Sequence, residues 1–143
     1  MINQYCTFPK IELIKLFKLT LFNYLVGNED MHLKNFSIIT KNQKNYLSPA
    51  YDLLNTTIAM TNPKEELALP LKGKKNNLTK KDFLTYFAVE RLKLNQKIID
   101  EMIDNFLQIT PSWYLSIDNS FLSKEMKQKY KNLLQERLDK LFT

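Results

Sequence analysis

The sequence has few of the residues on which several classes of protein site depend. It contains two glycines, Gly27 and Gly73, in 143 residues, and neither stands in a glycine-rich loop that would cover nucleotide phosphates. The single cysteine, Cys6, excludes an internal disulfide and favours a reducing compartment. Because only one histidine, His32, accompanies it, the chain has too few of the usual ligands for a zinc site.

Long apolar runs are absent as well. A membrane span requires about 20 apolar residues. The run over residues 11–26 is interrupted by Glu12, Lys15, Lys18 and Asn23. The N-terminus also lacks the basic start, apolar middle and cleavage site of a signal peptide. We therefore expect a cytoplasmic protein with no membrane segment.

The composition that is present is that of a globular protein with a basic surface. Apolar residues make up 44% of the chain, enough for one domain with a buried core. The formal net charge of +6 favours anionic partners in general. Much of this excess lies in Lys72, Lys74, Lys75, Lys80 and Lys81. This cluster has no arginine and no interleaved aromatic residue, so it suits a solvated turn better than base recognition.

Apolar residues at helical spacing predict four helices, so the expected fold class is mainly α with a small β-hairpin. The helices are expected at residues 9–26, 80–91, 95–111 and 123–141. Pro9 suits the first turn of the first helix, and Gly27 suits the left-handed position after its last residue. Thr79 and Asn95 are the expected N-caps of the next two helices, and Pro111 is expected to end the third.

The region between the first two helices predicts little regular structure beyond the hairpin. Residues 36–40 and 46–47 flank a polar turn and predict two short antiparallel strands. Residues 55–66 are expected to form a loop whose length indicates mobility or function. Residues 67–71 alternate weakly and predict an edge strand, because Pro70 would break an interior one.

The polar stretch of residues 27–37 directly follows the first helix and is the strongest candidate for a site. Asp30 and Asn35 are five residues apart, and Asp52 lies seventeen residues further on, across the hairpin. Phosphoryl transfer from ATP uses such a set: one carboxylate orients the attacking hydroxyl, while an amide oxygen and a second carboxylate hold magnesium. Each residue alone also fits a polar loop whose side chains cap turns, but their joint spacing does not.

Further residues around these three complete two motifs. The first consists of Gly27, Asn28, Asp30, His32, Lys34, Asn35 and Ser37. It resembles the catalytic loop of the HipA family of bacterial serine/threonine kinases, the toxins of toxin–antitoxin pairs. The second, residues 47–54, resembles that family's metal-binding segment, with Tyr51-Asp52 in place of Asp-Phe-Gly. A further likeness continues over residues 66–79.

The resemblance implies a fold and a domain organisation. Residues 1–143 would form the helical C-terminal lobe of a protein-kinase-like fold. The catalytic and metal-binding loops would lie in residues 27–54, with a helical remainder over residues 79–142. Within these loops, Asp30 would be the catalytic base or hydroxyl-orienting group. Asn35 and Asp52 would be the ligands of Mg²⁺.

The resemblance leaves the roles of four other side chains open. His32 would contact phosphate or metal, or would instead brace the loop by hydrogen bonding. Lys34 would reach the transferred phosphate or face solvent. Asn28 would shape the backbone where the helix ends, and Tyr51 would flank the nucleotide or pack on the core.

A kinase of this type also requires a β-rich lobe that binds ATP through a phosphate-covering loop and a strand lysine. We expect that lobe to be absent here, because only eight residues precede the first helix. Apolar surface is expected near Ile38, Ile39 and Leu47, where such a lobe would pack.

The expected function is therefore that of a toxin-type kinase lobe, inactive without the ATP-binding lobe. It would transfer the ATP γ-phosphate to a hydroxyl of a protein substrate. Its other partners would be an antitoxin and a polypeptide that supplies the missing lobe, and DNA would be contacted only through the antitoxin. The alternatives are a non-catalytic partner-binding fragment of a toxin–antitoxin complex and a fragment of a small-molecule kinase.

Overall fold

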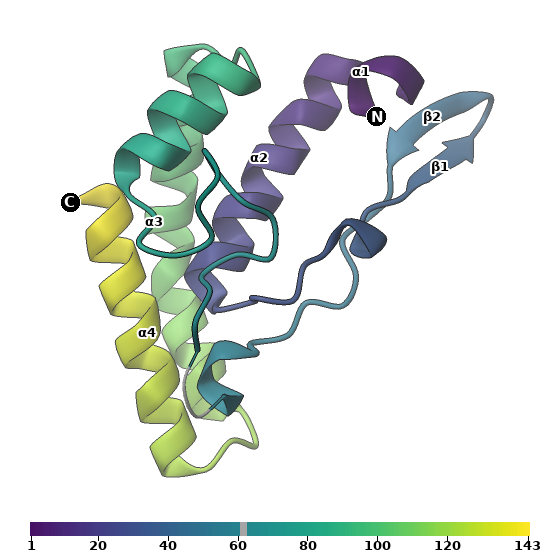
Figure 1. The fold of residues 1–143 in the computed structure, drawn as a ribbon. Coiled ribbons are helices and arrows are strands. Elements are labelled where there is room, and N and C mark those ends of the chain that lie inside the picture. The colour runs from purple at the N-terminus through teal and green to yellow at the C-terminus, as the bar shows by residue number, and fades with distance from the viewer. Residues whose placement is uncertain (61–62) are drawn as a thin grey trace.

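The computed structural model describes residues 1–60 and 63–143 (Figure 1). Its regular elements are α1 (Ile2–Tyr5), α2 (Pro9–Val26), β1 (Ile38–Lys41), β2 (Lys44–Leu47), a π-helix (Asp82–Arg91), α3 (Gln96–Asn119) and α4 (Lys124–Phe142), with single 3-10 turns at Leu33–Asn35 and Thr57–Ala59. The expected class, mainly α with a small hairpin, is confirmed. Among the described residues, no helix combines the length and apolar character that a membrane crossing requires.

Helix α2 lies at the centre of the fold and has the boundaries that its sequence predicts. Pro9 occupies its first turn, and Gly27 follows its last residue in the left-handed conformation. Three of its side chains, Phe17, Leu21 and Leu25, are fully buried in a core shared with α3, α4 and the π-helix. Figure 1 shows α3 and α4 on one side of α2 and the hairpin projecting on the other. The loops that follow α2 and β2 therefore lie between the helical body and the hairpin.

The hairpin is confirmed, with a tighter turn than the sequence suggests. Strand β1 pairs antiparallel with β2, with Ile38 opposite Leu47 and Lys41 opposite Lys44. Only Asn42 and Gln43 form the connection, and both have positive φ, 50° and 61°. This is the two-residue turn whose twist matches that of paired strands.

Two predictions about the middle of the chain are wrong. Residues 67–71 do not form an edge strand, because the backbone bends at residues 68–69 and Leu71 makes only an isolated antiparallel bridge to Lys74. Residues 82–91 wind as a π-helix rather than an α-helix. Its hydrogen bonds run from residue i to i+5, which brings Phe83 and Ala88, both fully buried, onto one side. Residues 55–66 lack strands or long helices as expected, although residues 61–62 lie outside the described part.

The prediction that Pro111 ends a helix is also wrong, because α3 continues through it to Asn119. Proline removes one backbone donor and crowds the carbonyl four residues earlier, which here belongs to Leu107. Pro111 lies on the exposed side of the helix, where that carbonyl can turn to water. The hydroxyls of Thr110 and Ser112 donate to carbonyls of the preceding turn at 2.7 Å. The predicted N-cap at Asn95 is confirmed, since its side chain accepts the backbone N–H of Ile98. Ser123 caps α4 in the same way, by accepting the backbone N–H of Met126.

Candidate functional site

Gly27 ends α2 and joins the candidate catalytic loop to a second segment. Its φ of 76° lies in the left-handed region, and its N–H closes the helix on the carbonyls of Asn23 and Tyr24. Its own carbonyl accepts hydrogen bonds from the N–H groups of Thr56 and Thr57, both at 3.0 Å, and from the Thr57 hydroxyl at 2.9 Å. The end of α2 is thereby fixed to the segment that follows Asp52.

Asn28 links three parts of the site and is only 1% exposed. Its amide Nδ2 donates to Oδ1 of Asn23 at 3.0 Å and to the backbone carbonyl of Asp52 at 3.3 Å. Its Oδ1 accepts the backbone N–H of Asp30 at 3.1 Å. A buried amide with all these partners holds its neighbours in one arrangement. Asn28 therefore fixes Asp30 and Asp52 relative to α2, as expected for a residue that shapes the backbone.

Asp30, Asn35 and Asp52 come together although the hairpin separates them in the sequence. The amide Nδ2 of Asn35 donates to the backbone carbonyl of Asp30 at 3.2 Å and to Oδ2 of Asp52 at 3.3 Å. Asp52 has a φ of 57°, a conformation that aspartate tolerates better than most residues. The three side chains lie at the surface, where a ligand can reach them.

The other candidates lie around these three. Nε2 of His32 is 2.8 Å from Oδ1 of Asp30, a contact of the kind that braces a loop. The hydroxyl of Tyr51 donates to the backbone carbonyl of Lys34 at 3.0 Å, so this tyrosine connects the two loops at the surface and is not packed in the core. The Lys34 side chain is exposed.

Sequence reasoning missed two buried acids near the site. Glu29 is buried beside Asp30, its Oε1 accepts the Thr57 hydroxyl at 2.6 Å, and its N–H donates to Oγ1 of Thr56 at 2.9 Å. Glu12, inside α2, is fully buried and its Oε2 accepts the backbone N–H of Leu47 at 2.9 Å. The only signal in the sequence for Glu12 is an acid among apolar residues of a central helix.

A third missed residue comes from the far end of the chain. Arg137 of α4 is 4% exposed, donates from Nη1 to the carbonyl of Tyr24, and lies 4.9 Å from the centre of the Tyr24 ring. Burial lowers the pKa of the Arg137 guanidinium and raises the pKa of the Tyr24 hydroxyl. Within the described residues, that hydroxyl has no hydrogen-bond partner. Helix α4 thus supports the end of α2 from which the candidate catalytic loop departs.

The oxygen atoms of Asn35 and Asp52 fit the demands of Mg²⁺. Among the described residues, no three histidine, cysteine, aspartate or glutamate side chains cluster as metal ligands, so a site here depends on an amide oxygen. Adjacent ligands of an octahedral magnesium ion, bonded at about 2.1 Å, lie about 3 Å apart. The 3.3 Å between Asn35 Nδ2 and Asp52 Oδ2 is close to that spacing, and a half-turn of the amide presents its oxygen in place of its nitrogen.

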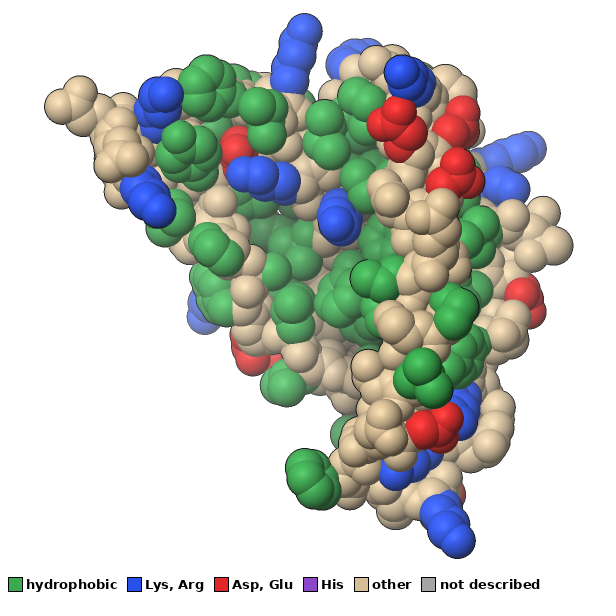
Figure 2. All heavy atoms as spheres, turned by 180° about the vertical axis from the view of Figure 1, so that it is seen from behind, with side chains coloured by type: hydrophobic (Ala, Val, Ile, Leu, Met, Phe, Trp, Pro, Cys, Tyr) green, Lys and Arg blue, Asp and Glu red, His purple; other side chains and the backbone are tan. Residues whose placement is uncertain are grey.

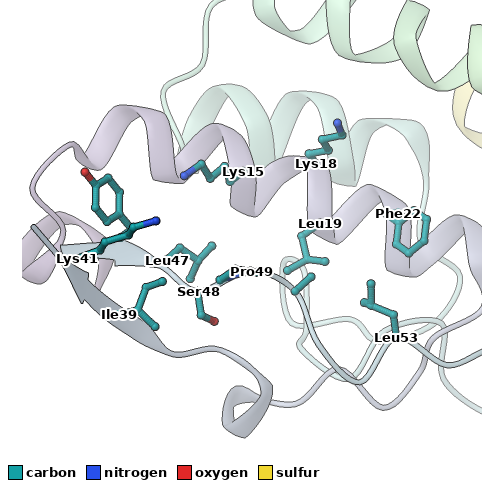
Figure 3. Close-up of a pocket in the computed structure, with 12 residues that line it drawn as sticks. Lys15, Lys18, Leu19, Phe22, Ile39, Lys41, Leu47, Ser48, Pro49 and Leu53 are labelled. Atoms are coloured by element: carbon teal, nitrogen blue, oxygen red, sulfur yellow. The ribbon is translucent and has the colours of Figure 1, made fainter. Parts of the chain in front are cut away.

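An apolar groove lies between α2 and the hairpin, beside the Asp52 segment. Its volume is about 680 Å³, and its lining includes Leu19 and Phe22 of α2, Ile39 of β1, Pro49 and Leu53 (Figure 3). On the face shown in Figure 2, apolar side chains gather around a hollow with basic side chains along part of its edge. Apolar surface of this kind is typical of binding sites for other polypeptides or for ligands.

The expectation of apolar surface near the hairpin is confirmed at one of its three residues. Ile39 is 40% exposed, whereas Leu47 is 5% exposed. Ile38 is half-buried against a small core that includes Leu47, Ile2 and Cys6. The exposed apolar surface is therefore carried mainly by Ile39 and by residues of α2 and the segment after β2.

Residues 1–114 match the family model described as the HipA-like C-terminal domain. The chain belongs to this family. It is similar to two proteins of Sinorhizobium fredii, "Putative kinase Y4mE", 38% identical over 74 residues, and "Putative kinase Y4dM", 40% identical over 80 residues. These matches cover 52% and 54% of this chain, but only 17% and 19% of the two relatives. The resemblance of the two motifs to HipA proteins is confirmed at the level of the family.

The fold is shared with a HipA-type structure. A chain from the complex of HipA, HipB and operator DNA of the Shewanella oneidensis toxin–antitoxin system matches with a TM-score of 0.73 and 21% identity. The match covers 96% of this HipA-like chain and 33% of the other. The chain thus spans about a third of the length of the HipA-type chain that it matches.

Proposed function

We propose that this HipA-like domain is the catalytic lobe of a serine/threonine protein kinase that transfers the γ-phosphate of ATP to a protein hydroxyl. Asp30 is the catalytic base or orienting group, and Asn35 and Asp52 are the magnesium ligands. Support comes from the family membership and from the relatives described as kinases. The observation that carries the proposal is the hydrogen-bonded contact of Asn35 with both Asp30 and Asp52.

In the proposed reaction, Asp30 orients the acceptor hydroxyl and takes its proton. The hydroxyl oxygen forms a bond to the γ-phosphorus, the bond from that phosphorus to the oxygen bridging it to the β-phosphate breaks, and ADP leaves. Asn35 and Asp52 hold Mg²⁺, which neutralises charge on the phosphates when bound. His32 braces the Asp30 carboxylate, and the exposed Lys34 side chain is available to a phosphate as a point charge.

ATP must be presented to these residues by a second lobe, which belongs either to the same protein or to a separate polypeptide. The apolar groove between α2 and the hairpin is the proposed contact for that lobe. It borders residues 48–50, which lead directly into Asp52, so docking there places the nucleotide close to the metal ligands. Without that lobe, we expect the chain to bind ATP weakly and to be inactive.

The proposed setting is the cytoplasm and a toxin–antitoxin pair. The structural match belongs to a complex of HipA with HipB and operator DNA, which favours an antitoxin as partner. Any contact with DNA would then be made through the antitoxin. The lysine cluster at residues 72–81 offers little for direct base recognition, since Lys74 and Lys75 lie 3.8 Å and 3.1 Å from Asp82 and Glu65, respectively.

A non-catalytic role in binding a partner is the second candidate, and the apolar groove is the observation that favours it. A fragment of a small-molecule kinase is the third. The candidates are distinguished by the reaction of the chain once the second lobe is present. A purely binding role predicts no phosphoryl transfer, whereas a small-molecule kinase would transfer phosphate to a metabolite and not to a protein.

The test combines the chain with the polypeptide that supplies the ATP-binding lobe and measures transfer of labelled phosphate from ATP. Asp30→Ala is expected to reduce kcat by about 10²–10⁴-fold, the usual contribution of a positioned base. Asp52→Asn should raise the magnesium concentration required for half-maximal rate. As a matched control, Asp118→Asn changes an exposed acid of α3 that the mechanism does not use. Activity retained in Asp30→Ala would reject the proposed role, and micromolar ATP binding by the isolated chain would reject the need for a second lobe.

A further inference from the structure

A second hollow borders Asp30 away from the proposed magnesium ligands. It is an open cleft of about 900 Å³, and Asp30 and His32 form one part of its wall. Leu54, Ala59 and Met60 supply its apolar surface, and the remaining lining is polar or charged: Glu29, Asn55, Thr56, Lys64 and Glu65. Asn35 and Asp52 are not among its lining residues. The cleft thus reaches the proposed base without including the groups assigned to the metal.

Two apolar side chains that line this cleft are exposed. Leu54 is 60% exposed and Met60 is 52% exposed. Both belong to the segment that follows Asp52, and both line the cleft that contains the Asp30 carboxylate. Exposed aliphatic side chains next to a polar reacting group are typical of a binding cleft, where they contribute affinity while the polar groups orient the ligand.

The segment that carries these side chains is held firmly. Between Leu54 and Met60, Thr56 and Thr57 bond to the Gly27 carbonyl and to Glu29. Oδ1 of Asn55 accepts the backbone N–H of Ile58 at 3.1 Å. These hydrogen bonds fix the backbone between the two apolar residues. The apolar surface is therefore a preformed feature and needs no rearrangement to meet a ligand.

We propose that this cleft binds the acceptor as an extended protein segment, with its serine or threonine hydroxyl at Asp30 and an adjacent aliphatic side chain on Leu54 and Met60. This inference rests on the proposed function, because it takes Asp30 as the group that meets the acceptor. The inference adds a sequence preference of the acceptor: a residue next to its serine or threonine is aliphatic. A small polar metabolite would make no use of the two exposed side chains, so the cleft favours a protein acceptor over a metabolite.

The first test uses the isolated chain and a library of nine-residue peptides with a central serine and one varied position in each set. We expect peptides with leucine, isoleucine, valine or methionine beside the serine to bind best. With the best of these, amide NMR signals of Asp30, Leu54 and Met60 should shift. The same peptide with asparagine in place of the aliphatic residue should bind at least tenfold more weakly. Absence of peptide binding, or of any aliphatic preference, overturns the inference.

Substitutions then locate the binding surface. Leu54→Asp and Met60→Asp should each weaken binding of the best peptide at least tenfold. Leu107→Asp is the matched control, because Leu107 is 46% exposed on α3 and is not part of the cleft. A far-ultraviolet circular dichroism melt of each variant checks that the fold is kept, since all three residues are exposed. Binding unchanged in both cleft variants places the peptide elsewhere and overturns the inference.

The same variants separate this inference from the proposed function. In the kinase completed with its ATP-binding lobe, Leu54→Asp and Met60→Asp should raise the KM for the peptide and leave the KM for ATP unchanged. Transfer that proceeds with an unaltered peptide KM would reject the cleft while keeping the kinase. Peptide binding at the cleft with no transfer in the completed protein would reject the kinase while keeping the cleft.

Discussion

Replacing Gly27 by alanine tests how tightly the start of the candidate catalytic loop is packed against the rest of the domain. Gly27 has a φ of 76°, and a β-carbon there would lie 2.6 Å from Cδ2 of Leu133, 2.8 Å from Oδ1 of Asn55 and 3.1 Å from Cβ of Thr57. An L-residue in the left-handed region costs about 1–2 kcal/mol. Overpacking costs about 1–3 kcal/mol more. We therefore expect Gly27→Ala to lower the free energy of unfolding by about 2–5 kcal/mol, as measured by urea unfolding at neutral pH.

Gly73 provides a matched control for that experiment. Its φ of 77° is almost the same, but a β-carbon there would meet no heavy atom within 4 Å. Gly73→Ala should therefore show only the backbone cost of about 1–2 kcal/mol. The difference between the two variants reports the contact of the loop with Leu133 of α4, and adding Leu133→Ala to Gly27→Ala should recover part of it. Equal losses in the two glycine variants would refute the reasoning.

Three further substitutions are expected to change stability for separate reasons, and urea unfolding measures each. Burial alone would raise the pKa of Asp82, but hydrogen bonds from Thr79 and the charges of nearby lysines outweigh it and hold that pKa below its usual value of about 3.9. The ionised Asp82 carboxylate therefore stabilises the fold at pH values above about 3.9, and this stabilisation is lost as the pH falls through the lowered pKa. The free energy of unfolding of Asp82→Asn should lack this acid-dependent decrease, and pH profiles that run parallel for the two proteins would contradict the reasoning. Glu12→Ala should cost about 1–3 kcal/mol, because the N–H of Leu47 loses its acceptor; an unchanged midpoint would argue against that contact. Arg137→Ala should lower the free energy of unfolding by about 1.5–3 kcal/mol, because a buried charged hydrogen bond is lost. Arg91→Ala, which removes an exposed arginine, is the comparison, and a smaller loss in Arg137→Ala than in Arg91→Ala would exclude this contribution.

The parts of the fold that the sequence predicts well are those governed by local chemistry. Helix α2 begins at Pro9 and ends before Gly27 because proline lacks a donor that the first turn does not need and glycine adopts a positive φ. The caps at Asn95 and Ser123 follow from side chains that accept backbone N–H groups three residues later. Such signals act within one turn, so tertiary contacts do little to change them.

The wrong predictions concern segments whose conformation is set by their surroundings. Pro111 would end an isolated helix, but buried Phe106 and Ile117 hold the two halves of α3 on the same core. The π-helix places Phe83 and Ala88 together in that core, which a pattern of apolar residues alone does not distinguish from α-helical winding. In both cases the energy of burying apolar surface outweighs the local preference.

The candidate site shows the same division. The spacing of Asp30, Asn35 and Asp52 suggests a phosphoryl-transfer set, and the structure brings these residues into hydrogen-bonding contact. The apolar pair of the second cleft, Leu54 and Met60, follows no periodicity, and only Leu54 falls within a motif, as the last residue of the second one. It becomes visible only when the segment after Asp52 folds back onto Gly27.

The geometry of the candidate catalytic loop depends on residues outside the two motifs. Arg137 bonds to the carbonyl of Tyr24, 113 positions away in the chain, and Leu133 packs against Gly27. Both residues belong to α4, which lies beyond the residues 1–114 that match the family model. The motif supplies the chemical groups, whereas α4 holds the end of α2 from which those groups are directed. A variant can therefore keep all the motif residues and still lose the site, because the alignment of Asp30 with Asp52 depends on where α2 ends.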